Sequence, residues 1–429
     1  MQFQSVLNSM FQDIVREERS LQFRVGQIFY GKVNRLFNGQ HAEISLGSHK
    51  LIAKLEVPLV SGEGYWLQVA SDEEGVQLKL LEGYSQFPQN TSKVATFIRT
   101  LGLRDTKTNQ MLGNYLLKEE LSLTKAEILT AAKLLSEVSD TGLGLQTIKM
   151  MKEKNMPLNE AVFKSFMAVE QEHSTVDLIR HLQRALTIEK DIQRSGQDLL
   201  QLIRSWNLES EKQMTLQTEF GRHEALKELK QGITRTGFDY EAKILNGDIQ
   251  KENFSEALKP LLVRYIQDGS IHSSLQTKEI VGQLLNRMNG FQLHSNEFNQ
   301  LQTIMYEIPI TIGGSIRELT MQWSGKRAND GKLDPNFCHI MFYLELQNLE
   351  STIVNMHVQN RIVNITIIND SKTIQTMAGD LIPVLKNGLK DLNYTLSGVH
   401  FKETYQEKVQ KKKKAYHQTY ASSGVDIRI

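Results

Sequence analysis

The sequence predicts a multidomain α+β protein with a small N-terminal β-barrel, a helical middle and a C-terminal mixed α+β domain. The first observation is a change of period. Apolar residues alternate along residues 22–84, take helical spacing over residues 92–305, and alternate again within residues 306–401. The second is length, because 429 residues are enough for two to four domains of about 150 residues. The third is composition, since 40% hydrophobic and 23% charged residues are ordinary for a globular chain.

Charge and cysteine content exclude several classes of protein. Lys and Arg number 50 against 49 Asp and Glu, so the formal net charge of +1 argues against polyanion binding over the whole surface. The single cysteine, Cys338, cannot form an internal disulfide or a thiolate zinc cage. No apolar run reaches the ~18 residues needed to cross a bilayer. We therefore expect a cytoplasmic protein.

Residues 1–21 are predicted to form an amphipathic N-terminal helix. Their apolar residues recur at three- and four-residue spacing on one face, and these are Phe3, Val6, Leu7, Met10, Phe11 and Ile14. The segment lacks the basic start and the apolar core of a secretory signal. We expect this helix to pack on the following domain, with a surface-seeking or export-recognised segment as the alternative.

Residues 22–84 are predicted to form a small barrel of the OB or SH3 type. Short alternating strands are separated by turn residues such as Asn38-Gly39. Such barrels often bind nucleic acid or peptides. The candidates for base stacking are Tyr30, Phe37, Tyr65 and Trp66, of which two are expected in the core. Because Lys and Arg do not cluster in this segment, a structural or protein-binding barrel is favoured over a nucleic-acid site.

Residues 92–305 are predicted to be helical, with hairpin repeats suggested by two similar helix starts. Thr124 and Glu127 have the spacing of a capping box, and Asn159 is a second N-cap candidate. Gly142-Leu143-Gly144 lacks the third glycine of a dinucleotide fingerprint and is interpreted as a helix stop.

Candidate catalytic and metal-binding groups are few. His173 and His181 lie on the same predicted helical region without a third ligand, and we interpret them as two solvated histidines. The sequence contains no phosphate-binding loop, no zinc-protease motif, no nucleophile elbow and no CxxC pair. We therefore expect a protein that is not an enzyme, with no cofactor, no metal and no catalytic residues.

Residues 306–401 are predicted to form a compact α+β domain. Alternating apolar segments predict strands, and Asn360-Arg361 predicts a hairpin between the two strands that flank it. Asn369-Asp370-Ser371 then opens a helix with Ile374, Met377, Leu381 and Leu385 on one face. Pro383 predicts a kink or break in that helix.

This succession of strands, helix and closing strand resembles the C-terminal domain of flagellar hook-length control (FliK-like) proteins. The resemblance covers roughly 100 of the 429 residues and is carried mainly by apolar spacing. It involves Leu346 to Leu349, Ile353 to Val358, Ile362 to Ile367, Met377, Leu381, Leu385, Leu389, Leu392 and Leu396 to Phe401.

The resemblance implies a flagellar assembly factor that contacts a protein partner. In that family the C-terminal domain contacts the switch component of the type III export gate and changes the specificity of export, while the N-terminal half is itself exported. The residues expected to dock are Leu349, Ile353, Met356, Val358, Ile362, Leu385, Leu389, Val399 and Phe401. The alternative is a nucleic-acid-associated or helical-repeat protein-binding scaffold.

Residues 402–429 form a basic tail with a net charge of +4, from six Lys and one Arg against three acidic residues. Its electrostatic contacts are expected from Lys408, Lys411, Lys412, Lys413 and Lys414. The tail is interpreted as a solubilising segment, with an acidic partner, membrane headgroups or nucleic acid as alternatives.

Overall fold

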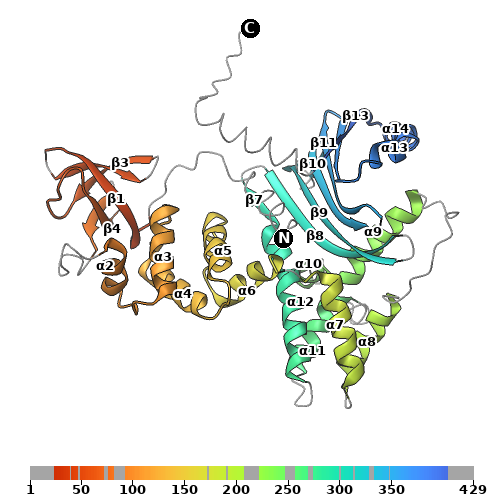
Figure 1. Ribbon diagram of the computed structural model, residues 1–429, viewed down its shortest axis with the longest axis horizontal. Helices are drawn as coiled ribbons and strands as arrows, with labels where there is room; N and C mark the ends of the chain where they lie inside the picture. Colours follow the sequence, from red (N-terminus) through yellow and green to blue (C-terminus); the bar gives the residue numbers. More distant parts are fainter. Residues whose placement is uncertain are drawn as a thin grey trace, which may run out of the picture. The chain divides into compact units, whose positions relative to one another are not determined.

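The computed structural model describes residues 24–403 apart from short gaps (Figure 1), and the chain divides into two compact units, Met1–Glu170 and Gln171–Ile429. The gaps are 39, 47–48, 72–75, 82–91, 172, 190–191, 207–221, 247–256, 269–273, 299–300, 313–314, 328–332 and 347. The predicted N-terminal helix and the five tail lysines lie outside the described residues.

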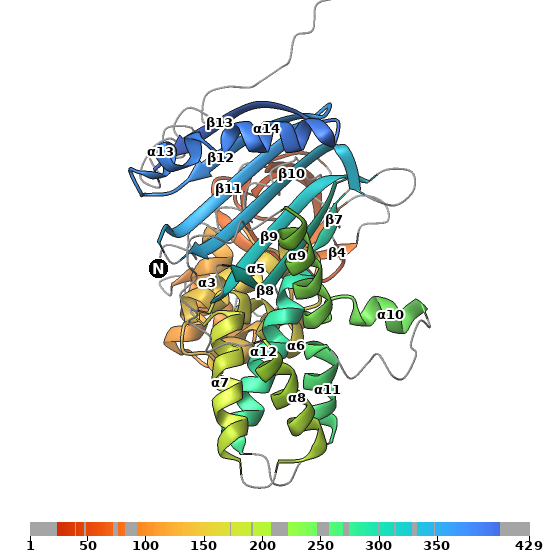
Figure 2. The ribbon, with the colours of Figure 1, turned by 90° about the vertical axis from the view of Figure 1, so that its right-hand side faces the viewer.

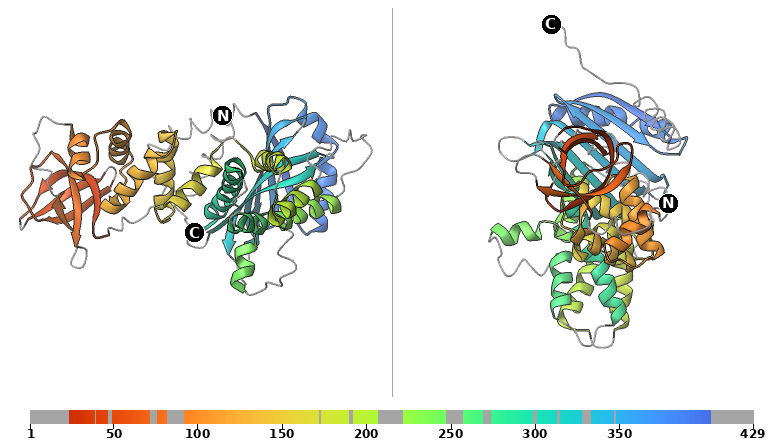
Figure 3. Two further views of the ribbon diagram at one scale, coloured as in Figure 1. Left: turned by 90° about the horizontal axis from the view of Figure 1, so that it is seen from below. Right: turned by 90° about the vertical axis from the view of Figure 1, so that its left-hand side faces the viewer.

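The first unit contains the predicted barrel, and the right-hand view of Figure 3 shows it end-on as a ring. Its five strands are β1 (Gln27–Leu36), β2 (His41–Leu46), β3 (His49–Leu55), β4 (Gly64–Ser71) and β5 (Gln77–Leu80). Strand β1 pairs with both β2 and β4, and a parallel β3–β5 pairing completes the circle. This closed strand order is that of an OB-type barrel. Of the two predicted barrel types, OB and SH3, the structure therefore has the OB type.

The barrel interior follows the alternation of the strands. Phe29, Val33 and Ile44 point inward with the other buried apolar residues. Gly31 is required because a Cβ there would lie 2.7 Å from Ile44 Cγ2. Trp66 stacks on Phe97 with ring centroids 3.8 Å apart, so a helix is fixed against the barrel.

Among the described residues, five helices and a two-residue strand follow the barrel in this unit. They are α2 (Lys93–Thr100), α3 (Lys107–Lys118), β6 (Leu123–Thr124), α4 (Lys125–Ser136), α5 (Thr141–Glu153) and α6 (Glu160–Val169). Both predicted caps are confirmed, because Thr124 and Glu127 form a capping box and Asn159 accepts from the Val162 N–H at 2.9 Å. The interpretation of residues 142–144 as a helix stop is wrong, since Asp140 caps α5 and these residues form its first turn.

The second unit begins with a run of helices, which Figures 1 and 2 show beside and below the sheet. The helices are α7 (Thr175–Ile188), α8 (Arg194–Ser205), α9 (Arg222–Thr236), α10 (Tyr240–Asn246), α11 (Leu258–Gln267) and α12 (Leu275–His294). Helix α12 packs on α7, α11 and β8, and α9 packs on β8. The predicted helical middle is therefore divided between the two units.

A seven-stranded sheet, ordered β13-β12-β11-β10-β9-β8-β7, forms the core of the second unit. Its strands are β7 (Asn296–Phe298), β8 (Leu301–Ile312), β9 (Ser315–Arg327), β10 (Leu333–Leu346), β11 (Glu350–Gln359), β12 (Ile362–Ile368) and β13 (Thr395–Lys402). All neighbours are antiparallel except β12 and β13. The strands of this sheet begin at Asn296, earlier than the predicted domain start at residue 306. The predicted hairpin is confirmed, and Asn360 and Arg361 both have positive φ.

Two short helices, α13 (Ile374–Gly379) and α14 (Ile382–Asp391), connect β12 to β13 and lie beside them in Figure 2. The predicted break is confirmed, because Pro383 occupies the first turn of a separate helix. Barrel, helices and mixed sheet together confirm the predicted fold class. Among the described residues, none of the helices combines the length and apolar character that crossing a bilayer requires.

Candidate nucleic-acid interface

Four basic side chains gather on the outer surface of strands β1, β2 and β3. Lys32 lies opposite Ser45, and Ser45 lies opposite Lys50, while Lys54 lies opposite His41. Arg35 follows a register shift in β1 and lies opposite Glu43. All four side chains are exposed. The residues on either side of Lys54, for example, point into the barrel. We call Lys32, Arg35, Lys50 and Lys54 the basic face.

One carboxylate lies within the basic face and is held there by its neighbours. Asn34 Nδ2 donates to Glu43 Oε1 at 3.0 Å, and Lys50 Nζ lies 3.4 Å from the same oxygen. The Asn34 hydrogen bond, followed by those contacts with Lys50, lowers the pKa of Glu43. Glu43 therefore stays ionised near neutral pH. Four cations and one carboxylate leave a net charge of +3 on this surface.

An aromatic ring borders the basic face. Phe37, in the β1–β2 connection, is 45% exposed, and its N–H donates to the His41 carbonyl at 2.7 Å. Ile52, next to Glu43 across the strand pair, is 65% exposed. Exposed rings offer a flat surface on which bases stack, and apolar side chains can extend that surface.

The other predicted stacking candidates are engaged within the unit. Trp66 is buried, as expected for a core residue, and Tyr30 packs edge-on against it with centroids 5.5 Å apart. The Tyr30 hydroxyl accepts from Lys93 Nζ at 2.7 Å, and the Tyr65 hydroxyl accepts from the Val60 N–H at 3.3 Å. Phe37 is thus the most exposed of the predicted candidates.

The expectation that basic residues do not cluster in this segment is wrong. Lys32, Arg35, Lys50 and Lys54 are separated in sequence by the β1–β2 and β2–β3 turns, and strand pairing brings them onto one surface. Lys50 and Lys54 share a parity on β3, whereas Lys32 and Arg35 reach one face of β1 only through the register shift between them. A search for runs of charge therefore misses the group.

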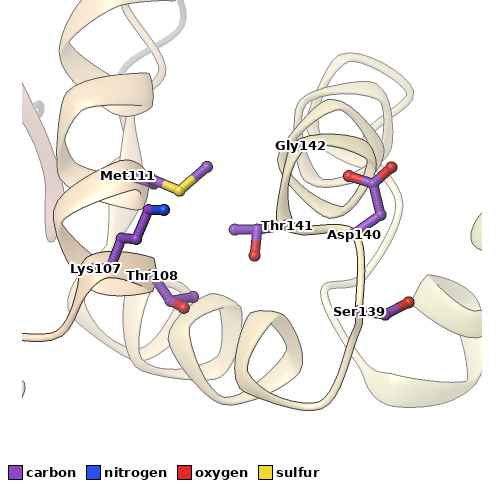
Figure 4. Close-up of a pocket in the computed structure, with 7 residues that line it drawn as sticks. All are labelled: Lys107, Thr108, Met111, Ser139, Asp140, Thr141 and Gly142. Carbon is purple, nitrogen blue, oxygen red and sulfur yellow. The ribbon is translucent and has the colours of Figure 1, made fainter.

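A hollow of about 540 Å³ lies between α3 and α5 in the same unit (Figure 4). Lys107 and Met111 border it from α3, and Thr141 borders it from α5. The Asp140 carboxylate accepts from the Leu143 N–H at 2.9 Å, so it is used to cap α5. Among the described residues that line the hollow, no hydroxyl is hydrogen-bonded to a side chain that could act as a base. Among the described residues, no group of three or more His, Cys, Asp or Glu side chains is placed to hold a metal ion.

The predicted docking residues of the C-terminal sheet occupy different environments. Ile353 and Val358 are buried in the core, and Met356, Leu389 and Val399 pack against the cluster that contains Val358. Leu349 and Phe401 are half-buried. Ile362 and Leu385 are exposed. The nine residues therefore do not form one surface, and two of them are shielded from any partner.

Leu385 belongs to an exposed apolar surface on α13 and α14. Its other members are Met377, Leu381, Val384 and Leu392, of which Leu381 is 64% exposed. The spacing of Met377, Leu381 and Leu385 predicts an apolar stripe, but that stripe points away from the sheet. Leu389 instead contacts the sheet core. We call these five residues the α13–α14 surface.

The comparisons with known proteins bear mainly on the barrel. Residues 3–79 match the family model described as the TP0910 S1-like domain, a span that includes nearly all of strands β1–β5. The uncharacterised protein YlqG of Bacillus subtilis (strain 168) is 30% identical over 152 residues, which are 35% of this chain and 26% of YlqG. The chain thus spans about a quarter of the length of that relative. No solved structure matches the chain.

Proposed function

We propose that the protein binds single-stranded nucleic acid on the basic face of its barrel. The observation that carries the proposal is the clustering of four cations beside an exposed Phe37 on strands β1–β3 of an OB-type barrel. OB barrels bind oligonucleotides on the surface of strands 2 and 3 and on the adjoining loops. The S1-like match over residues 3–79 supports the same interpretation. The binding takes place in the cytoplasm and involves no catalysis.

The basic face and Phe37 have different roles in this proposal. Lys32, Arg35, Lys50 and Lys54 contact phosphates, which gives affinity without sequence preference and makes binding weaken with salt. Phe37 stacks on one base, which contributes about 1–3 kcal/mol. A surface of this size accommodates a short single strand better than a rigid duplex, because stacking requires an unpaired base.

Fluorescence anisotropy of a labelled single strand of about 12 nucleotides tests the proposal on the full chain. The test variant is Lys32→Gln/Arg35→Gln/Lys54→Gln. The matched control is Lys118→Gln/Lys125→Gln/Lys133→Gln, which removes the same charge from exposed helical positions in the same unit. We expect the test variant to lose about tenfold or more in affinity and the control to bind like the parent. Equal binding by parent and test variant would contradict the proposal.

A second candidate function is the docking role implied by the hook-length control resemblance. The observation that favours it is the α13–α14 surface, which lies within the region of resemblance and includes the predicted docking residue Leu385. In this proposal the surface contacts the cytoplasmic part of the flagellar export-gate switch protein, and burial of its apolar side chains supplies the affinity.

A pull-down of the full chain with that switch domain, at low and high salt, tests the second candidate. Docking through apolar side chains survives high salt and is lost in Leu381→Ser/Val384→Ser. Thr373→Ala/Lys386→Ala, at other positions of the same region, is the control. Absence of binding, or binding that the Leu381/Val384 variant keeps, counts against the α13–α14 surface. Binding that is lost at high salt in the parent protein would indicate that charged groups, and not the α13–α14 surface, make the contact.

A further inference from the structure

A buried group of charged side chains joins the helices of the second unit to its sheet. Arg287 comes from α12, Glu307 from β8 and Glu318 from β9. Arg287 and Glu307 are each 1% exposed, and the Glu318 side chain is 12% exposed. Charged groups are rarely buried so completely unless neighbours bond them. We call Arg287, Glu307 and Glu318 the buried triad.

Arg287 and Glu307 form a two-point ion pair. Arg287 Nε donates to Glu307 Oε2 at 2.5 Å, and Arg287 Nη2 donates to Glu307 Oε1 at 2.6 Å. The Thr175 hydroxyl, at the start of α7, also donates to Glu307 Oε2. Glu307 is therefore bonded from both α12 and α7, and this geometry favours its ionised form.

Glu318 bonds to the start of the same helix. Ser174 caps α7, which leaves the next backbone N–H groups in need of acceptors from elsewhere. The Val176 N–H donates to Glu318 Oε2 at 3.0 Å. Arg287 Nη2 lies 3.9 Å from the other oxygen, Glu318 Oε1. Glu318 thus links β9 directly to the first turn of α7.

The two carboxyl groups of the triad come from neighbouring positions of the sheet. Glu307 pairs with Thr320 and Glu318 with Pro309, so the two acidic residues are diagonal neighbours on one face of the β8–β9 pair. Both carboxyl groups face the Arg287 guanidinium, Glu307 through two hydrogen bonds and Glu318 with its Oε1 atom 3.9 Å from Arg287 Nη2. Two buried carboxylates beside one guanidinium would leave a negative charge unbalanced, which favours a proton on one of them.

We propose that the buried triad retains one proton and acts as a proton-dependent latch between α7 and strands β8 and β9. With the proton in place, a single guanidinium faces one carboxylate and one neutral carboxyl group. Loss of the proton leaves two buried carboxylates beside one guanidinium, and their repulsion loosens the start of α7 from the sheet.

The proton resides on Glu318. Burial, followed by the negative charge of Glu307, raises the pKa of Glu318 well above its usual value. Burial also opposes the ionised form of Glu307, but the guanidinium of Arg287 outweighs it and holds the pKa of Glu307 below its usual value. The proton on Glu318 stabilises the docked state most at low pH. This stabilisation declines above the ordinary pKa of a glutamate and is lost as pH rises through the raised pKa of Glu318.

Other ionisable groups around Glu318 do not replace it as the titrating group. Tyr343 on β10 is close enough for the Glu318 charge to act on it, and burial first of all raises its pKa, so it stays neutral. On α7, Asp177 and Arg180 pair with each other at 3.3 Å, and their side chains are partly exposed.

Hydrogen exchange of the full chain between about pH 5 and pH 9 tests the latch, after correction for the intrinsic rates. The amides of α7 report the latch, and those of α3 in the first unit are an internal control. In the parent protein we expect the opening constant of the first turn of α7 to rise by up to tenfold per pH unit until it levels off.

The variant Glu318→Gln removes the titrating group and keeps an acceptor for the Val176 N–H. We expect its α7 opening constant to be independent of pH in this range. The control Glu279→Gln removes an exposed carboxylate of α12 and keeps the parent profile. A flat profile for α7 in the parent protein overturns the latch without requiring any variant. An unchanged pH dependence in Glu318→Gln overturns the assignment to Glu318.

Discussion

Replacing Arg287 with methionine removes the cation of the buried triad while conserving much of the side-chain volume. Glu307 then has no guanidinium to balance its charge, and it is 1% exposed. Two charge-assisted hydrogen bonds, at 2.5 and 2.6 Å, are lost at once. Breaking a buried ion pair from one side costs about 3–5 kcal/mol, because an uncompensated charge remains. We expect a loss of that size in the free energy of unfolding of the second unit.

The double variant Arg287→Met/Glu307→Met separates this cause from lost packing. With both partners apolar, no buried carboxylate remains at position 307, and such replacements are often neutral. The Thr175 hydroxyl loses its acceptor, which costs about 1–3 kcal/mol. We therefore expect the double variant to be more stable than Arg287→Met alone.

Urea unfolding at pH 7, followed by tryptophan fluorescence in a Trp66→Phe background, measures both variants. This background leaves Trp206 and Trp323, which both belong to the second unit. A cost below about 1 kcal/mol for Arg287→Met would show that the isolated Glu307 carboxylate is not destabilising. A double variant as unstable as the single one would likewise show that the cost does not come from that carboxylate.

Three further predictions concern the first unit. With four cations of the basic face contacting phosphates, the logarithm of the binding constant for a single strand should fall against the logarithm of salt concentration with a slope of about −3. A slope near zero would mean that phosphates are not contacted. Gly31→Ala should cost about 1–3 kcal/mol in thermal unfolding, because the added Cβ would lie 2.7 Å from Ile44 Cγ2, and an unchanged Tm would show that the barrel adapts. Thr124→Ala should cost about 1 kcal/mol in urea unfolding by removing the capping box with Glu127, whereas Thr124→Ser should be nearly neutral.

Features of the fold that depend on local signals could be predicted from the sequence. The caps at Thr124 and Asn159 depend on residues three positions apart, and the structure contains both. The hairpin at Asn360-Arg361 and the helix break at Pro383 depend on backbone preferences of one or two residues. Such signals act before any long-range contact forms, so they are visible in the sequence.

Features that depend on contacts between residues far apart in the sequence could not be predicted from it. The basic face exists only because the pairing of β1, β2 and β3 places Lys32, Ser45 and Lys50 in one row. The sequence contains no run of basic residues there that would indicate it. The buried triad similarly depends on the packing of α12 on β8. Its one sequence signal is Glu307, a charged residue between Tyr306 and Ile308 in an apolar strand.

The face that a helix turns toward the sheet also could not be predicted from the sequence. Met377, Leu381 and Leu385 have the spacing of a core-facing stripe, yet all three are exposed. Helical spacing defines a face without stating what covers it. The same limit explains why the nine predicted docking residues include both core and surface positions.

Photo-crosslinking of the full chain to a single strand carrying 5-iodouridine, followed by mapping of the modified peptides, tests the proposed nucleic-acid interface most directly. The proposal predicts crosslinks at Phe37 and in the peptides of β1, β2 and β3, competed by unlabelled single strand and weakened by salt. Crosslinks confined to the lysines of residues 404–429, or to the second unit, would contradict a binding site on the barrel.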